Sequence, residues 1–245
     1  MSRPSELCAL SFNIKVGVDS SPATIARDLL GAERALGTLH LCALQEVGRC
    51  WQMGVPVHQA AYLASCLRHQ AHHFAPALTD DEGGQFGVAV TATYPLEGVQ
   101  QRLLPRVVDE QRSLLSFTLS PEGWSRPLNV LTTHLSVSQE EREAQARVIA
   151  DEVRRTEGPL LLLGDLNDLP NSLTLSTLIE AGLTDHWREH HGEALGYSFS
   201  VKQPNRRIDY LLSRGLTCLE IKLLTALKSS DHFPLWGRFM LSEGL

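Results

Sequence analysis

Eight short apolar runs, spaced along nearly the whole chain, constrain the fold more than any other feature of this sequence. Runs of this kind, bounded by turn-forming residues, are typical of buried β-strands. Three other segments repeat their apolar residues near the helical spacing. The expected strands lie at 7–14, 38–47, 86–93, 112–119, 127–135, 159–166, 207–213 and 234–240, and the expected helices at 22–37, 58–70 and 138–155.

The order of these segments predicts an α/β fold. Strands dominate the middle of the chain, roughly 86 to 135, whereas the flanks mix strands and helices. This order favours a four-layer α/β sandwich, in which two mainly antiparallel β-sheets pack face to face and helices cover the outside. No linker-like stretch interrupts the chain, so a single domain over residues 1–245 is expected. Ser138 and Glu141, at the start of the third helix, predict a capping box.

The segment LLLLGDLND, residues 160–168, runs four leucines into a group of carboxylate and amide side chains. We expect the leucines to form a buried strand and Gly164 to let the backbone bend at its end. Asp165, Asn167 and Asp168 then have two interpretations. They could satisfy the backbone of an ordinary Asx-type turn, or they could be held on a rigid strand as part of a reactive site.

Polar residues suited to chemistry recur at or near the ends of the expected strands. Strand ends hold side chains at the rim of a sheet on rigid supports, where sites tend to be built. A single such residue is usually a cap or a turn former, but the recurrence favours a shared site. Asp209 is the exception, because it is expected inside its strand. The others are Asn13, Glu46, His134, Asp165 with Asn167, and Asp231 with His232.

Charge and cysteine usage limit the class of protein. The net charge of -6 and the pI near 5.9 argue against a basic surface for gripping nucleic acid, although a local cationic pocket remains compatible with them. Five scattered cysteines without CxxC spacing favour a reducing compartment over a disulfide framework. The first residues show no leader-like apolar segment, and no run approaches the ~20 residues of a membrane span. We therefore expect a monomeric cytoplasmic protein.

Six short motifs, taken together, resemble a known family. SFNI, LQEV, TTHLSV, LLLGDLND, RRIDYL and SSDHFPL occur in the order and approximate spacing of the endonuclease/exonuclease/phosphatase family of metal-dependent phosphoesterases. The resemblance extends from about residue 7 to residue 240. It implies a magnesium or manganese site in which Glu46 is the principal ligand, Asn13 lies beside it and Asp231 lies near the ion. Carboxylate and amide oxygens are hard ligands that suit such ions.

The same resemblance implies catalytic roles. His232 would contact the scissile phosphate and handle a proton, and Asp165 with Asn167 would position or deprotonate the attacking water and steady the phosphate. His134 would supply a second imidazole. Asp209 would support one of the two histidines by fixing its tautomer, and the sequence leaves open whether its partner is His232 or His134.

Several other residues carry weaker expectations. Arg112 either contacts the substrate phosphate or forms only a surface ion pair, and Arg207 is expected to belong to the scaffold. His186 and His190 stand one helical turn apart, but no glutamate or cysteine completes a zinc set, so solvated histidines are favoured. Val88 stands where many members of the family carry an asparagine, which puts the contacts usually made there in doubt.

The sequence thus predicts a divalent-metal-dependent phosphoester hydrolase. A phosphodiesterase or phosphatase acting on a small molecule or lipid head group competes with a nuclease acting on DNA or RNA, and the acidic pI favours the former. A non-catalytic binding module on the same fold is the rival class. Such a module would be expected to have lost Glu46, Asp165 or His232, and all three are present.

Overall fold

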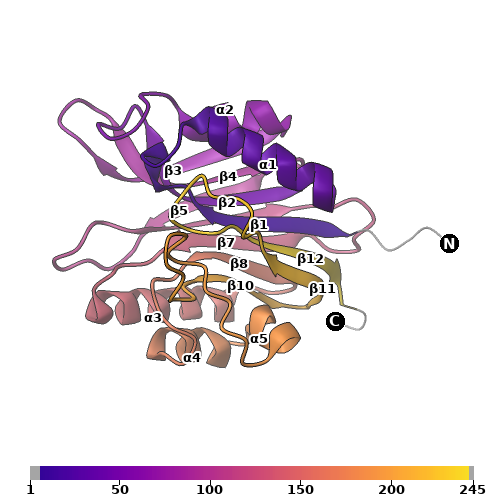
Figure 1. Ribbon diagram of the computed structural model, residues 1–245. Coiled ribbons are helices and arrows are strands. Elements are labelled where there is room, and N and C mark those ends of the chain that lie inside the picture. The colour runs from indigo at the N-terminus through magenta and orange to yellow at the C-terminus, as the bar shows by residue number, and fades with distance from the viewer. Residues whose placement is uncertain (1–5, 243–245) are drawn as a thin grey trace.

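Two six-stranded sheets pack face to face and carry helices on their outer surfaces in the computed structural model, which describes residues 6–242. Helices α1 (Pro22–Leu36) and α2 (Gln59–Leu67) cover the first sheet, at the top of Figure 1. Helices α3 (Gln139–Arg155), α4 (Leu173–Glu180) and α5 (His186–His191) lie below the second sheet (Figure 1). The expected four-layer α/β sandwich is therefore confirmed.

Both sheets are mixed, and antiparallel pairs dominate in each. The first has the order β11-β12-β1-β2-β4-β3, and its one parallel pair is β1 with β2. The second has the order β5-β6-β7-β8-β10-β9, and its parallel pair is β7 with β8. The strands of the first sheet are β1 (Leu7–Asn13), β2 (Leu41–Arg49), β3 (Ala71–Thr79), β4 (Gln85–Ala92), β11 (Leu216–Leu223) and β12 (Leu235–Leu241). Those of the second are β5 (Glu97–Leu103), β6 (Ser113–Leu119), β7 (Leu128–His134), β8 (Leu160–Asp165), β9 (Thr184–Asp185) and β10 (Asp209–Arg214).

The two parallel pairs determine where the polar strand ends lie. β7 and β8 end side by side in the second sheet. In the first sheet β1 ends beside Gln45 of β2, which continues to Arg49, so Glu46 lies inside its strand and not at the expected strand end. β1 also packs across the interface against β8. In the view of Figure 1, β1 lies between β2 of its own sheet and β7 of the second sheet. The carboxyl ends of β1, β7 and β8 are thus gathered at one edge of the sandwich, together with Glu46 inside β2.

The leucine run of β8 is continuous because the strand is buried on both faces. Leu161 and Leu163 belong to the apolar cluster between the two sheets. Leu160 and Leu162 point to the other side and join the cluster beneath α3 and α4. A strand covered on both faces has no position for a polar side chain until it ends. β8 is therefore a rigid mount for Asp165, its last residue.

Gly164 has a different role from the one expected. It lies inside β8, paired with Thr133 of β7, and does not mark a bend after the strand. A Cβ atom at this position would stand 2.2 Å from the Thr133 carbonyl oxygen. The glycine is therefore needed for the close approach of β7 and β8 immediately before the polar strand ends.

Substituting Gly164 tests this packing. Gly164→Ala should lower the free energy of unfolding by about 1–3 kcal/mol or more, because the added methyl group forces two backbones apart. Gly31→Ala is a matched control, since Gly31 lies inside α1 and its Cβ position is 3.9 Å from the end of the Arg34 side chain, an ordinary contact. That change should stabilise the protein by roughly 0.5–1 kcal/mol. Urea unfolding of both variants measures the two effects, and a Gly164→Ala protein as stable as the parent would contradict the packing argument.

Several elements were not expected from the sequence. β3, β5, β9, β11, α4 and α5 fall outside the predicted segments. β5 is an edge strand that reads EGVQQRL and is mostly exposed, so it carries little apolar signal. β11 does alternate buried and exposed residues over its first half, and this period-2 pattern could have revealed it.

The capping box expected at the start of α3 is wrong. Ser138 occupies the N-cap position but makes no capping side-chain hydrogen bond. Glu141 turns away from it and accepts hydrogen bonds from the backbone N–H groups of Val107, Val108 and Asp109. It thereby ties the loop before β6 to α3.

Two further observations concern the whole chain. All five cysteines are free. Within residues 6–242, no helix has the length and apolar character that crossing a membrane requires. Residues 1–5, on which part of the prediction about a leader rests, lie outside the described residues.

Candidate active site

Asn13 joins the two sheets at the edge where the polar strand ends gather. It is the last residue of β1 and is fully buried. Its Nδ2 donates to Asp165 Oδ2 at 3.0 Å, at the end of β8, and to Glu46 Oε1 at 2.9 Å, on β2. A single amide therefore holds two carboxylates that are contributed by opposite sheets.

Asp209 lies at this same edge, in contrast to its expected place inside a strand. It is the first residue of β10, and the antiparallel pairing sets it directly opposite Asp165. Its Oδ2 lies 2.8 Å from His232 Nδ1. The sequence left open whether Asp209 supports His232 or His134, and in the structure its partner is His232. On the other side of the ring, His232 Nε2 lies 3.6 Å from Asp165 Oδ2.

The electrostatics of this group follow from burial and from the closeness of its charges. Burial alone lowers the pKa of His232, but the carboxylates of Asp209 and Asp165 outweigh it and raise the pKa to about 9. Burial and the neighbouring Asp209 raise the pKa of Asp165 to about 7. A carboxylate that titrates near neutrality is suited to exchanging a proton there.

His134 is held in a different state. It ends β7, and its Nδ1 lies 3.0 Å from Arg112 Nη1. Because a guanidinium only donates, Nδ1 is the acceptor and the neutral ring carries its proton on Nε2. Burial, together with the charges of Arg112 and His232, lowers the pKa of His134 well below its usual value. Two histidines at one site therefore hold opposite charge states.

Arg112 is not the surface residue that one interpretation expected. Its side chain is buried and contacts His134, and its Nη2 lies 3.3 Å from Glu110 Oε2. An ion pair is thus present, but on a guanidinium that is directed into the site. A contact with substrate phosphate stays a prediction.

The GDLND turn contains the hydrogen bond of the Asx-type interpretation, and its part in a reactive site stays a prediction. Asp165 Oδ1 accepts from the Asn167 backbone N–H at 2.9 Å, which is the Asx-type hydrogen bond of an ordinary turn. The Asn167 side chain donates to the Leu135 carbonyl at 2.9 Å and lies 3.0 Å from His134 Nε2. The backbone φ of Asn167 is +52°, a left-handed conformation that non-glycine residues seldom adopt. Local hydrogen bonds hold it in place beside the site.

Glu46 shows the same backbone feature, with φ of +51°. Strained residues of this kind cluster at functional sites. Its carboxylate is half-buried, and Asn13 is its hydrogen-bond partner among the described residues. Burial raises the pKa of Glu46, which reflects the cost of leaving its negative charge without a contacting cation. A carboxylate oxygen and an amide oxygen in this setting fit a hard divalent cation.

Asp231 is only partly buried, and its carboxylate forms an ion pair with Lys15. Its Oδ2 lies 3.0 Å from Lys15 Nζ, and Lys15 also pairs with Asp19 at 3.0 Å. The sequence did not single out Lys15, although it follows the SFNI motif directly. Coordination of a metal by Asp231 stays a prediction.

Asp165, Asp209 and His232 also form a group whose ligand atoms lie within 4.8 Å of one another. A histidine must lose its proton to bind a metal. His232, however, is flanked by two carboxylates that favour the imidazolium. This group therefore fits a shared proton better than a cation, and Asn13 with Glu46 are the stronger candidates for metal ligands.

The sequence prediction missed Phe199. Its ring contacts that of His232, with a centroid separation of 4.8 Å. The guanidinium of Arg206 also lies over the Phe199 ring, 4.5 Å from its centroid. The preceding residue, Ser198, accepts from the backbone N–H groups of Ile208 and Asp209 through its hydroxyl. The segment 197–199 thus runs directly beside the proposed catalytic group. An aromatic residue in a polar loop was the available signal.

The remaining expected residues lie around the site and do not enter it. Arg207 forms a buried two-fold ion pair with Asp185, which confirms its scaffold role. His186 is buried, with its ring nitrogens against Glu189 and Ser213, so the expectation of a solvated histidine is wrong for it. Val88 packs in the core between the sheets.

Asp168 forms an ion pair with a residue outside the group of Asp165, Asp209 and His232. Its Oδ2 lies 3.0 Å from Arg142 Nε, at the start of α3. The pair anchors the GDLND turn to the helix that covers β8.

Glu141 allows a test of how the rim of the site is held. Hydrogen bonds to its carboxylate, led by those from the backbone of Asp109 and Val108, lower its pKa. A lowered folded-state pKa contributes stability above the unfolded-state value, about 4.3 for Glu, and loses it as the pH falls through the folded-state value. Glu141→Gln should therefore destabilise the protein at pH 7, and the difference from the parent should shrink below pH ~4. Urea unfolding at several pH values measures this. A difference that is independent of pH would contradict the role of the charge.

Comparisons with known proteins agree with this architecture. The family model for the Endonuclease/Exonuclease/phosphatase family matches residues 10–232. The uncharacterized protein YbhP of Escherichia coli strain K12 is 27% identical over 157 residues, which are 62% of this chain and 62% of YbhP. The alignment thus covers less than two thirds of that relative.

Solved structures show the same fold. An endonuclease/exonuclease/phosphatase from Beutenbergia cavernae superposes with a TM-score of 0.81 at 24% identity, over 97% of this chain and 72% of that one. The human Nocturnin catalytic domain gives 0.75 at 18% identity, over 99% and 97%. The mannosyl-6-phosphatase Bt3783 of Bacteroides thetaiotaomicron gives 0.74 at 15% identity, over 96% and 100%.

The family match covers most of the chain, and the chain belongs to the endonuclease/exonuclease/phosphatase family. Members of this family are hydrolases that act on phosphoesters, among them nucleases and phosphatases, and they generally depend on a divalent metal.

Proposed function

We propose that this protein is a magnesium-dependent hydrolase of a small-molecule or lipid head-group phosphoester. The observation that supports this most is the position of His232 between two carboxylates, hydrogen-bonded to Asp209 at 2.8 Å and ion-paired with Asp165 at 3.6 Å, next to the Asn13–Glu46 pair at one edge of the sandwich. The group Asp209, His232 and Asp165 can hold and move a proton. The pair Asn13 and Glu46 offers oxygen ligands for a metal ion.

His232 and Asp165 do the proton work in this proposal. Asp209 fixes the orientation of the His232 ring through Nδ1, so that Nε2–H is directed into the site. There the imidazolium donates to an oxygen of the reacting phosphoester. Asp165, whose pKa lies near 7, accepts the proton of the attacking water.

His134, Asn167 and Arg112 steady the phosphate. Phosphoryl transfer depends on positioning and on neutralising charge at the phosphate oxygens. His134 presents Nε2–H because Arg112 donates to its Nδ1, and this nitrogen lies 3.5 Å from Asp165 Oδ2. His134 ends β7, Asn167 lies in the turn that follows β8, and Arg112 directly precedes β6, so little reorganisation is needed when the substrate binds.

Glu46 and Asn13 would hold the divalent ion, with Asp231 nearby. When bound, Mg²⁺ would supply positive charge to the phosphate oxygens. Asn13 then has two tasks, because the same side chain also orients Asp165.

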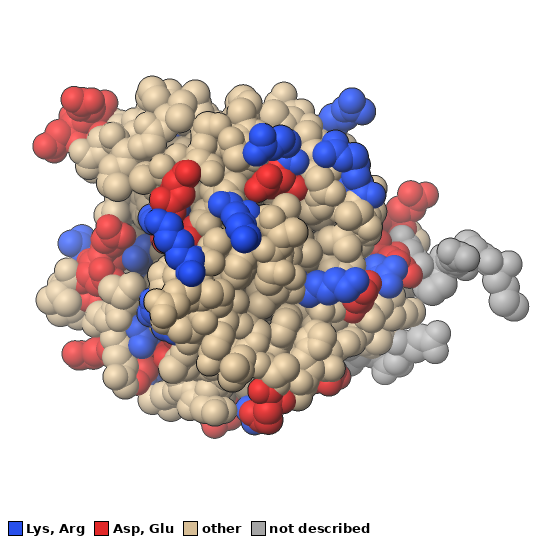
Figure 2. Space-filling model, in the orientation of Figure 1, with Lys and Arg blue, Asp and Glu red and all other residues tan. Residues whose placement is uncertain are grey.

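The charge of the surface favours a small substrate over a nucleic acid. Figure 2 shows Lys and Arg interspersed with Asp and Glu on the visible face, without a continuous basic stripe. The net charge is -6. Binding along a nucleic-acid backbone needs cations that replace the counterions of many phosphates.

A substrate panel tests the proposal. We expect turnover of at least one small-molecule or lipid phosphoester with Mg²⁺ and none with a chelator. Glu46→Gln should need more Mg²⁺ for half-maximal rate and should bind Mg²⁺ more weakly by calorimetry, because a ligand charge is lost. His232→Ala, purified in parallel, should lose roughly 10²–10⁴-fold in rate and so reveals any contaminating activity.

Two outcomes would contradict the proposal. Rapid, salt-sensitive cleavage of plasmid DNA by the parent, absent in His232→Ala, would favour a nuclease. Absence of turnover across the panel, with unaltered Mg²⁺ binding in Glu46→Gln, would favour a binding module on the same fold.

The Asp209–His232 pair allows a double-mutant test. Asp209→Asn should lower turnover, because the ring loses its orientation and its stabilising charge. In a His232→Ala background the same change should be nearly silent, since the supported ring is gone. In a His134→Ala background its full penalty should persist. Penalties that multiply in both backgrounds would show that Asp209 acts through neither histidine.

A further inference from the structure

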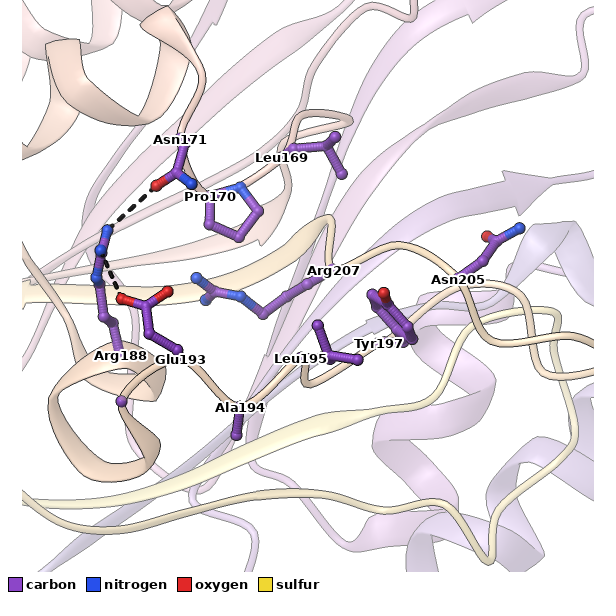
Figure 3. A pocket seen from close by; sticks show the side chains of 11 residues that line it. Leu169, Pro170, Asn171, Arg188, Glu193, Ala194, Leu195, Tyr197, Asn205 and Arg207 are labelled. Atoms are coloured by element: carbon purple, nitrogen blue, oxygen red, sulfur yellow. Dashed lines mark hydrogen bonds and ion pairs between the residues drawn. The ribbon is translucent and has the colours of Figure 1, made fainter.

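A pocket of about 330 Å³ opens between the turn after β8 and the loop that precedes β10. Figure 3 shows Leu169 and Pro170 on one side and Leu195 and Tyr197 on the other, with Arg207 between them in this view. The volume is that of a small-ligand site. No role in the chemistry described above uses it.

The pocket adjoins the proposed catalytic group on both of its sides. Leu169 is two residues beyond Asn167, and Tyr197 is two residues before Phe199, whose ring contacts His232. Two residues of extended chain span roughly 7 Å. The Tyr210 hydroxyl lies 2.8 Å from the Asp168 carbonyl oxygen and 3.0 Å from that of Arg207, which holds the two walls together. A group attached to a phosphate at the site can therefore reach the pocket.

The charged side chains of the pocket are already paired. Arg188 donates to Glu193 at 2.8 Å and to Asn171 at 3.3 Å (Figure 3). Arg207 is committed to Asp185 at 2.7 and 3.0 Å. Both arginines that line the pocket are thus engaged, which favours an uncharged occupant.

Three side chains of the pocket, Leu169, Leu195 and Tyr197, present apolar and aromatic surface to solvent. Leu169 is 50% exposed and Leu195 is 64% exposed, although both are large aliphatic side chains. Tyr197 adds a ring that is only partly buried. Covering these side chains with a ligand would remove apolar surface from water, at about 25 cal/mol per Å². Tyrosine also offers a flat face for stacking.

We propose that this pocket is the subsite for an uncharged, ring-bearing group esterified to the substrate's phosphate, a proposal that rests on the hydrolase function above. Leu169, Leu195 and Tyr197 are then specificity-determining residues. They select the organic part of the phosphoester, while the catalytic group acts on the phosphate.

Two matched, non-hydrolysable probes test the subsite by binding. Calorimetric titration with benzylphosphonate and ethylphosphonate, in the presence of Mg²⁺, measures how much the ring adds. We expect benzylphosphonate to bind about tenfold more tightly, or better, as apolar pockets discriminate by such factors. Phosphate release from benzyl and ethyl phosphate, two esters of alcohols with similar acidity, gives the kinetic counterpart. The preference there should appear mainly in KM.

Variants locate the preference. In Leu169→Ser/Leu195→Ser the benzyl-to-ethyl affinity ratio should fall towards one, while the affinity for ethylphosphonate stays unchanged. Tyr197→Ala should lower the ratio, and Tyr197→Phe should restore it, because the ring and not the hydroxyl is needed. Leu219→Ser, at an exposed leucine of β11, is the control and should keep the parental ratio.

Failure of the subsite and failure of the hydrolase function give different results. Equal affinity for the two phosphonates in the parent, or a ratio that survives in the Leu169→Ser/Leu195→Ser protein, overturns the subsite. A benzyl preference that the variants abolish, with no hydrolysis of any ester in the panel, supports the subsite and overturns the hydrolase proposal. Hydrolysis of esters in the panel without a benzyl preference supports the hydrolase proposal and overturns the subsite.

Discussion

The hydrogen bond between Asn13 and Asp165 is the contact on which the geometry of the site depends. It joins residues 152 positions apart and connects the last residue of β1 with the last residue of β8, across the interface of the two sheets. The same amide also donates to Glu46. The proposed metal ligands and the proposed proton acceptor therefore share one donor. Any shift of one sheet against the other would separate them, so the apolar packing between the sheets also preserves the site.

The charges around His232 form a second constraint. A buried imidazolium is costly unless carboxylates surround it, and Asp209 and Asp165 supply that compensation. The two carboxylates in turn repel each other, which is one reason that the pKa of Asp165 rises. The protonation of each group depends on the other two, and for this reason their substitution is expected to be non-additive. His134 lies 3.5 Å from Asp165, and burial, together with the charges of Arg112 and His232, lowers its pKa and keeps it neutral.

The scaffold separates rigid and variable parts of the site. Asp165 and His134 stand at the ends of strands that are buried on both faces, and Gly164 permits the close approach of those strands. The pocket, by contrast, is built from the turn after β8 and from the loop before β10. Loops tolerate change better than buried strands. If strand ends carry the chemistry and loops carry the selectivity, as proposed, the selectivity can change without disturbing the chemistry.

The sequence by itself determined the layers and most of the site. Apolar runs located eight strands, and apolar residues repeated near the helical spacing located three of the helices, because each element has to bury a face. The six motifs named the residues that meet at one edge. It did not reveal exposed strands such as β5, whose pairing owes little to apolar surface. Only the tertiary structure decided that Asp209 pairs with His232, that Arg112 is buried against His134, and that Glu141 holds a loop and not its own helix end. Each of these contacts joins residues between 22 and 34 positions apart in the chain. A sequence pattern records which side is buried, whereas the register of the strands and the packing of the sheets decide which polar groups meet.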